Sequence, residues 1–62
     1  MKISLRAARI NADLNLIPAA KLLGVGKDTL IKWEHNPKLV KAEYYKRISS
    51  VYKMPINCIF FD

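Results

Sequence analysis

Few side chains in this sequence are of the types that perform covalent or metal chemistry. Histidine and cysteine occur once each, as His35 and Cys58, so neither a zinc cluster nor an internal disulfide can form. No glycine-rich phosphate loop, carboxylate pair or nucleophile motif is present. We interpret His35 as a polar residue at a helix end and Cys58 as a buried thiol. The sequence indicates that the protein is not an enzyme, and we expect no catalytic residue, metal or cofactor.

The charged side chains are predominantly basic. Eleven lysine and arginine residues stand against five acidic residues, which gives a net charge of +6 on 62 residues. Such a charge favours a polyanionic partner, either a nucleic acid or an anionic membrane surface. The basic residues are spread around the helices rather than along one face, and no apolar run approaches the ~20 residues of a membrane span. We expect no membrane partner and, because no signal peptide is recognisable, a cytoplasmic location.

The elements that carry these residues are expected to be helical. Apolar residues recur at helical spacing almost throughout, without sustained strand-like alternation. Ser4 can cap a first helix and Asn15 a second. The predicted helices cover residues 5–12, 16–23, 27–35, 42–53 and 56–61, with a basic loop at 38–41. The expected fold class is all-α, a compact bundle of about five short helices that forms one domain over residues 1–62.

The same spacing predicts which residues form the core. The helices are expected to turn the following apolar residues inward: Leu5, Ala8, Ala12, Ala19, Ala20, Leu23, Leu30, Trp33, Tyr45, Ile48, Val51, Tyr52, Ile59 and Phe60. We therefore interpret the aromatic residues in this set as packing residues rather than as platforms for stacking bases.

Five residues between positions 20 and 33 meet the steric requirements of two steeply crossing helices. Ala20 is small enough for close approach, and Gly24, four positions later, can adopt the left-handed conformation of a tight turn. Val25 anchors the turn, and Leu30 and Trp33 form the inner side of the second helix. This set predicts a helix-turn-helix. The alternative is an ordinary helical hairpin that packs and binds nothing.

From Ser4 to Phe61 the sequence resembles the phage-repressor family of helix-turn-helix DNA-binding proteins, the Cro/CI-type or Xre-like regulators. Beyond the set above, the resemblance rests on residues 5–9, 19–25, 33–34, 52–56 and 59–61. It implies a lambda-repressor-like fold and a phage or prophage transcription regulator whose partner is double-stranded DNA. In this family an arginine of the first helix commonly pairs with the glutamate that ends the reading helix, which implies a structural brace between Arg9 and Glu34.

The resemblance also implies which residues contact DNA. Base edges would be read in the major groove from the reading helix, residues 26–34, by Gly26, Lys27, Asp28, Ile31 and Lys32. The lysines could donate to guanine, Asp28 could accept from cytosine, and Ile31 could touch a thymine methyl group. Phosphates would be held by backbone N–H groups at the start of the second helix and by a basic loop. The residues at these two places are Leu16, Ile17, Lys38 and Lys41.

The sequence departs from the family pattern within this set. The second helix of these proteins often begins with a polar residue, commonly glutamine, where this chain has Leu16-Ile17-Pro18. Gly26 replaces a polar residue that commonly opens the reading helix, and the carboxylate of Asp28 repels phosphate. These departures keep a second function open, an antirepressor-type interaction module that binds a partner repressor. For DNA binding we expect a homodimer on a palindromic operator, joined through residues 59–61 or through the Leu16-Ile17 tip.

Overall fold

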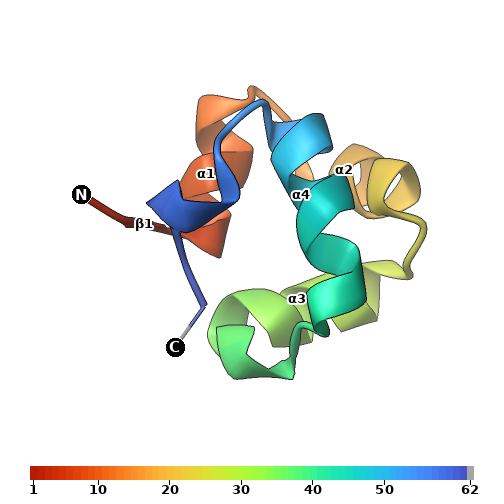
Figure 1. Cartoon of the computed structure of the whole chain (residues 1–62). Helices are drawn as coiled ribbons and strands as arrows, with labels where there is room; N and C mark the ends of the chain where they lie inside the picture. Colours follow the sequence, from red (N-terminus) through yellow and green to blue (C-terminus); the bar gives the residue numbers. More distant parts are fainter. Residues whose placement is uncertain (62) are drawn as a thin grey trace.

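The computed structural model describes residues 1–61, and Asp62, the last position of the expected domain, lies outside the described residues. Within this range the chain forms four α-helices, three 3-10 turns and two short strands. The helices are α1 (Leu5–Asn11), α2 (Leu16–Leu23), α3 (Lys27–His35) and α4 (Tyr45–Tyr52). The turns are η1 (Pro37–Leu39), η2 (Ala42–Tyr44) and η3 (Ile56–Cys58), and the strands are β1 (Ile3–Ser4) and β2 (Ile59–Phe60). Figure 1 shows α3 crossing below the other helices, with β1 at one side.

The start of α1 agrees with the sequence prediction, in which Ser4 caps the first helix. The hydroxyl of Ser4 accepts a hydrogen bond from the N–H of Ala7 at 3.0 Å, which pairs one of the free N–H groups of the first turn of α1. After α1 ends, Asp13 reverses the chain with a φ of 60°. Asn15 occupies the expected cap position of α2, but its side chain forms no hydrogen bond with the described first turn of that helix.

Gly24 makes the turn between α2 and α3. Its φ of 77° lies in the left-handed region, as predicted, where a residue without Cβ is favoured. The N–H of Gly24 donates to the carbonyl of Lys21 at 3.1 Å, and the N–H of Val25 donates to the carbonyl of Ala20 at 3.0 Å. These two bonds pair the last carbonyls of α2 and stop the helix. The predicted bounds of α2 and α3 are confirmed.

The core lies between the inner sides of the four helices. Its largest fully buried side chains are Leu5, Leu23, Leu30, Ile48 and Ile59. Each of these removes enough apolar surface from water to stabilise the fold by about 1.5–3 kcal/mol. The small residue Ala20, 2% exposed, lets α3 approach α2 closely. Three residues predicted for the core are instead half-buried at its margin: Ala12, Tyr45 and Val51.

The prediction of a helix over residues 56–61 is wrong. This segment forms the single turn η3 and then β2, which pairs in parallel with β1, Ile3 opposite Ile59 and Ser4 opposite Phe60. Along the strand burial alternates, so Ile59 is 1% exposed, whereas Phe60 is 46% exposed and does not close the core as expected. The β-branched and aromatic residues at 59–61 favour an extended chain, and a six-residue helix would form few internal hydrogen bonds.

The segment between α3 and the end of α4 is also divided differently from the prediction. Residues 42–44 form η2, and α4 begins only at Tyr45. The expected basic loop at 38–41 contains the end of η1 and Val40, which is 4% exposed. Burial of Val40 attaches this connection to the core, so the chain here is not a free loop. The expected all-α bundle is thus mostly helical as predicted, but it has four α-helices and a small strand pair.

Candidate nucleic-acid interface

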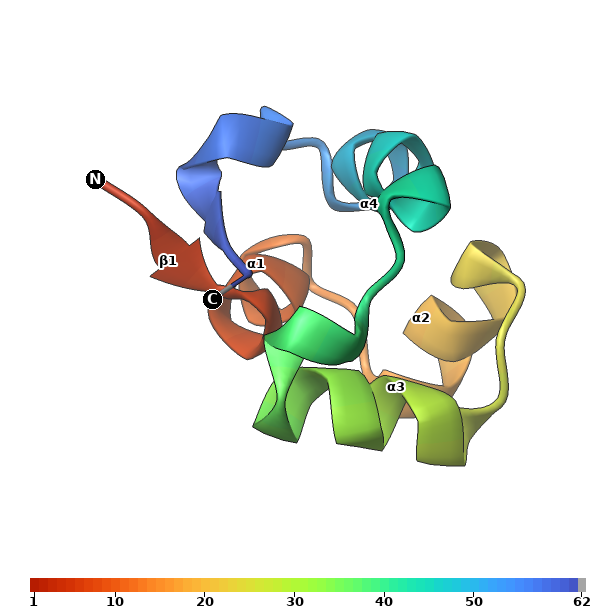
Figure 2. The same cartoon turned by 60° about the horizontal axis from the view of Figure 1, so that its bottom comes forward.

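The helix α3 has one buried side and one open side. Leu30 and Trp33 face the core at 0% and 6% exposure, which sets the rotation of the helix about its own axis. The opposite side presents a row of exposed residues four positions apart, Lys27, Ile31 and His35. Figure 2 shows α3 along one edge of the molecule, with the other helices on one side of it. The outer face of α3 is therefore accessible to a large ligand.

An ion pair connects α1 to the end of α3. The Nε atom of Arg9 donates to Oε2 of Glu34 at 2.7 Å, and Nη2 donates to Oε1 at 3.3 Å. The remaining nitrogen, Nη1, donates to the carbonyl of Leu14 at 3.0 Å, so the same side chain also holds the connection into α2. The two side chains are only 11% and 10% exposed. The hydrogen bond to Glu34 raises the pKa of Arg9 despite its burial, so the guanidinium stays charged.

Tyr52 of α4 lies close enough to this ion pair for the charges of Arg9 and Glu34 to affect its pKa. The side chain is 2% exposed, and among the described residues its hydroxyl has no hydrogen-bond partner. Burial raises the pKa of Tyr52 to about 12, the charge of Glu34 acts in the same direction, and Arg9 opposes it. Tyr52 therefore remains neutral beside a charged pair over the physiological pH range.

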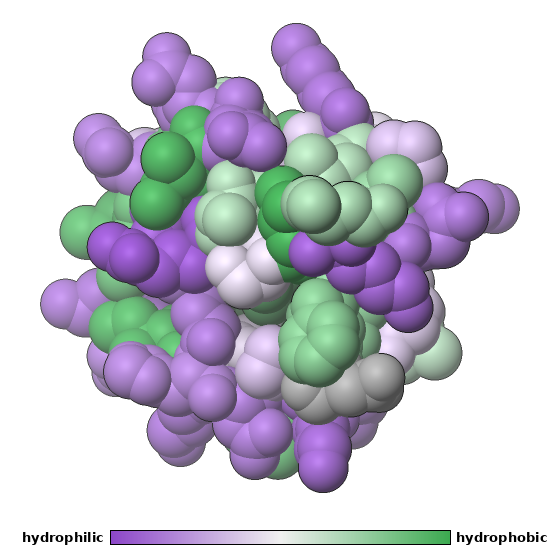
Figure 3. Space-filling model, turned by 90° about the vertical axis from the view of Figure 1, so that its left-hand side faces the viewer, coloured by the Kyte–Doolittle hydropathy of each residue, from purple (hydrophilic) through white to green (hydrophobic). Residues whose placement is uncertain are grey.

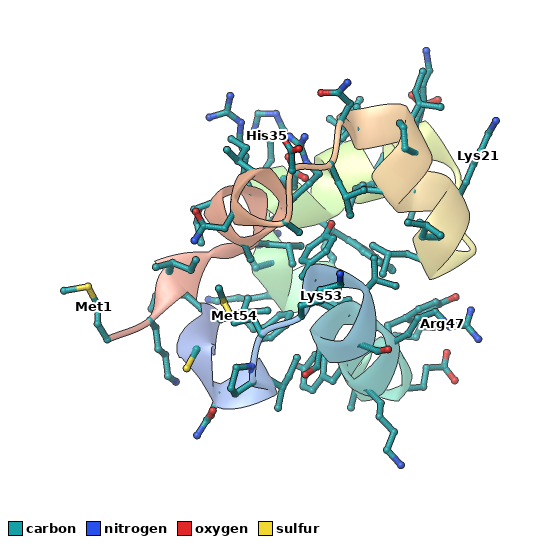
Figure 4. All side chains as sticks on the ribbon, turned by 90° about the horizontal axis from the view of Figure 1, so that it is seen from above. Met1, Lys21, His35, Arg47, Lys53 and Met54 are labelled. Atoms are coloured by element: carbon teal, nitrogen blue, oxygen red, sulfur yellow. The ribbon has the colours of Figure 1, made fainter. Side chains whose placement is uncertain are left out.

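A second arginine, Arg47 of α4, holds the opposite end of α2. Its Nη1 atom donates to the carbonyl of Leu23, the last residue of that helix, at 3.4 Å. Figure 4 shows Arg47 projecting from α4 toward this end of α2. A cation at a helix C-terminus is favourable because the last carbonyls carry partial negative charge. Arg47 was not among the residues predicted from the sequence, since no local pattern connects positions 23 and 47.

An open hollow of about 370 Å³ lies between α1, the start of α2 and the outer side of α3. We call it the α1–α3 hollow, and it is lined by Arg6, Arg9, Leu16, Ile31, Glu34 and His35. Leu16 and Ile31 both line this hollow, although Leu16 was predicted to lie at a phosphate contact and Ile31 at a base contact. Figure 4 shows His35 between α1 and the first turn of α2.

Two residues of the α1–α3 hollow, Arg6 and His35, were not among the predicted site residues. Helical periodicity could have found both of them. Arg6 precedes Arg9 by three residues on α1, and His35 follows Ile31 by four residues on α3, so each shares a helix face with a residue already in the site. The interpretation of His35 as a polar helix-end residue is correct for its position, because it is the last residue of α3.

The other predicted contact residues are all exposed. Those expected to read bases are exposed within α3 or just before it: Gly26, Lys27, Asp28 and Lys32. Ile17 is 52% exposed in the first turn of α2. Lys38 and Lys41 are exposed, but they follow the C-terminal end of α3 and do not line the α1–α3 hollow. The structure thus gathers part of the predicted site around the ion pair and leaves these two lysines beyond it.

Positive charge predominates around the outer face of α3. The carboxylate of Glu34 is balanced by Arg9, so Asp28 is the exposed acidic residue on a helix that also exposes two lysines. This distribution suits a polyanion. Within residues 1–61, no group of three or more His, Cys, Asp or Glu side chains could hold a metal ion. No described helix is both long enough and apolar enough to cross a membrane.

Comparison with known proteins agrees with this geometry. The sequence pattern of the helix-turn-helix family matches residues 5–57, from the first residue of α1 into η3. The matched range includes the turn at Gly24 and both members of the Arg9–Glu34 pair. No curated protein and no solved structure matches the chain.

Proposed function

Because this chain belongs to the helix-turn-helix family of Cro/CI-type, Xre-like DNA-binding domains, we propose that it is a sequence-specific transcription regulator that reads operator DNA with α3. The family is one of DNA-binding domains and not of enzymes. Membership confirms the lambda-repressor-like fold expected from the sequence, with the small strand pair as an addition to the helices.

The observation that supports this function best is the way in which α3 is held. Its inner side is fixed in the core by Leu30 and Trp33, and Glu34 is fixed to α1 by Arg9. Its outer side is exposed along its whole length. A helix that reads base edges needs both properties, because hydrogen bonds to bases tolerate little displacement.

In the proposed complex α3 lies in the major groove. Lys27 and Lys32 donate to the O6 and N7 atoms of guanine, and Asp28 accepts from the N4 amino group of cytosine. Gly26, just before Lys27, and Ile31, between Asp28 and Lys32, also approach the bases. Phosphates are held by the backbone N–H groups of the first turn of α2 and by flexible lysines. The residues proposed for these phosphate contacts are Leu16, Ile17, Lys38 and Lys41.

We further propose that the protein acts as a Cro-like repressor in the cytoplasm, of phage or prophage origin. A homodimer would occupy a palindromic operator whose half-sites are about 34 Å apart, and it would block the promoter by occupying it. Within residues 59–61, Ile59 is buried, so the dimer contacts proposed for this segment would be made by Phe60 and Phe61. The ring of Phe61 stacks on the ring of Tyr45, with the two ring centroids 4.4 Å apart. Figure 3 shows hydrophobic side chains exposed among hydrophilic ones on the face that carries the terminal strands.

A gel-shift titration tests the proposal. The probe is the DNA upstream of the protein's own gene, and the control is a duplex of the same length and composition in shuffled order. We expect tighter binding to the upstream DNA, and a steep fall of affinity with salt, because each phosphate contact contributes a slope of about −0.9 in log K against log salt. Absence of binding at micromolar protein, with both duplexes, would contradict the proposal.

The antirepressor-type module is the second candidate, and the exposed apolar residues of α2 favour it. Ile17 and Leu22 are 52% and 56% exposed, beyond what the fold itself requires. If the protein binds a partner repressor through this helix, Leu16→Ser abolishes activity while Lys27→Ala and Lys32→Ala are neutral. The proposed DNA-reading function requires instead that Lys27→Ala and Lys32→Ala each weaken operator binding more than Leu16→Ser does.

A further inference from the structure

Besides the Arg9–Glu34 pair, the α1–α3 hollow is lined by two apolar side chains, an arginine and a histidine. Leu16, at the start of α2, and Ile31, on the outer side of α3, line it from two helices, and Ile31 is 37% exposed. Arg6 and His35 line it as well, from α1 and from the last position of α3. Its two remaining lining residues, Arg9 and Glu34, bond to each other through two hydrogen bonds.

This composition limits what the hollow can recognise. A polar base edge placed against Leu16 and Ile31 would lose hydrogen bonds to water and gain none from these side chains. Both oxygens of the carboxylate of Glu34 already accept from Arg9, so its charge is directed to its counter-ion in the wall of the hollow. The hollow therefore suits an apolar group that is presented by an anionic molecule. In the major groove of DNA the C5-methyl group of thymine is such a group.

We propose that the α1–α3 hollow is a subsite for the thymine methyl group, in which Leu16 and Ile31 together determine specificity. The inference rests on the proposed DNA-reading function and deepens it. Ile31 stands in one row with Lys27, so a base pair beside the one that Lys27 reads faces the hollow. Arg6 and His35 border the methyl group and lie where the neighbouring phosphates pass. The apolar start of α2 is then part of the reading surface.

The test uses a single-methyl change in the DNA. The wild-type protein selects its tightest duplex from a library of unmethylated random duplexes, so that every selected C5-methyl group belongs to thymine. Each thymine of that duplex is then replaced in turn by deoxyuridine, which lacks the methyl group and keeps every hydrogen-bonding atom. We expect one or two positions at which uridine raises the Kd about fourfold, the effect of burying one methyl group.

Two protein variants assign that effect to the hollow. We call the factor by which deoxyuridine raises the Kd the uridine penalty. In Ile31→Ala, and again in Leu16→Ala, this factor should fall from about four to about one at those positions. Leu22→Ala removes an apolar side chain of α2 that is 56% exposed and lies outside the hollow, and it should keep the full penalty. Ile31 is partly exposed, so its alanine variant is expected to fold, which thermal unfolding checks.

Three results decide the matter. A uridine penalty that disappears in both hollow variants and persists in Leu22→Ala supports the subsite. Selected duplexes that bind equally well with uridine at every thymine, or a penalty that persists in both hollow variants, overturn the subsite and leave the proposed function in place. If no duplex is enriched by the wild-type protein, the proposed function itself fails and the subsite with it.

Discussion

The guanidinium of Arg9, on α1, donates two hydrogen bonds to the carboxylate of Glu34, near the end of α3, at 2.7 and 3.3 Å. The same guanidinium donates to the carbonyl of Leu14. One side chain therefore connects the first helix, the chain that leads into the second, and the helix proposed to read DNA. Because the two side chains are only 11% and 10% exposed, removal of one leaves the other charge without its counter-ion and with little access to water.

From this pair we expect Arg9→Ala to destabilise the protein by about 3 kcal/mol, the lower part of the range for breaking a buried ion pair. Thermal unfolding should then show a Tm lower by about 10 °C or more, given the size of the domain. Arg6→Ala is the matched control, since it removes an exposed arginine from the same helix, and its Tm should hardly change. Equal Tm values for the two variants would show that the pair is not structural.

Gly24 and Gly26 should respond differently to the same substitution. Gly24→Ala forces a Cβ into the left-handed region at φ 77° and places it 2.8 Å from Nη1 of Arg47. We expect a loss of about 1–2 kcal/mol from the backbone alone, and a further loss if Arg47 releases the end of α2. Around a Cβ at Gly26, the N-cap of α3, there is open space, so Gly26→Ala should lower the Tm less, through the poorer capping by alanine alone. Chemical unfolding of both variants, and of Gly24→Ala combined with Arg47→Ala, measures each contribution.

Because β2 is a strand, substitutions at its two neighbouring residues should differ in their cost to stability, which a terminal helix with both side chains in the core would not produce. Ile59→Ala should cost about 2–4 kcal/mol, because the side chain is fully buried and its removal leaves a cavity. Phe60→Ala, on the exposed side of the strand, should cost less than about 1 kcal/mol in the monomer. Urea unfolding at low protein concentration compares the two. A larger loss for Phe60→Ala than for Ile59→Ala would argue against this register.

Tyr52 makes stability depend on pH in the alkaline range. Its pKa is 10.0 in an unfolded chain and about 12 in the folded protein, so the folded state retains the proton to higher pH. The stabilisation is complete below pH 10 and is lost as pH rises through 12, at up to about 1.4 kcal/mol per pH unit. Tyr52→Phe should remove this loss, and at neutral pH it should be neutral or slightly stabilising because the hydroxyl has no partner among the described residues. Unfolding free energies of both proteins between pH 7 and pH 12 provide the comparison.

The proposed base readers should affect operator binding more than other lysines of equal charge. Lys27→Ala and Lys32→Ala should each weaken binding to the operator about tenfold, and weaken binding to a shuffled duplex much less. The control is Lys53→Asn, on the side of the molecule away from α3 (Figures 1 and 4). Asparagine tolerates the left-handed φ of 53° at this position, so only the charge changes. If all three variants lose the same affinity for both duplexes, the lysines act only through net charge.

Local patterns were sufficient for much of the fold. The bounds of α2 and α3, the cap at Ser4 and the left-handed turn at Gly24 depend on residues within a few positions of one another, and these predictions are confirmed. The inward direction of Leu30 and Trp33 follows from the same helical period. The ion pair between Arg9 and Glu34 was expected only from the resemblance, because helical periodicity does not relate residues of two different helices.

The tertiary structure decided what depends on residues far apart in the chain. Residues 56–61 became a turn and a strand because β1, at the other end of the sequence, offers hydrogen-bond partners there. Arg47 meets the end of α2, and Arg6, Leu16 and His35 meet Ile31, only after the helices have packed. By itself, the sequence determined that a basic helix would follow a tight turn. Which apolar and basic side chains stand beside that helix was decided by packing, since close-packed interiors fix neighbours that no local period contains.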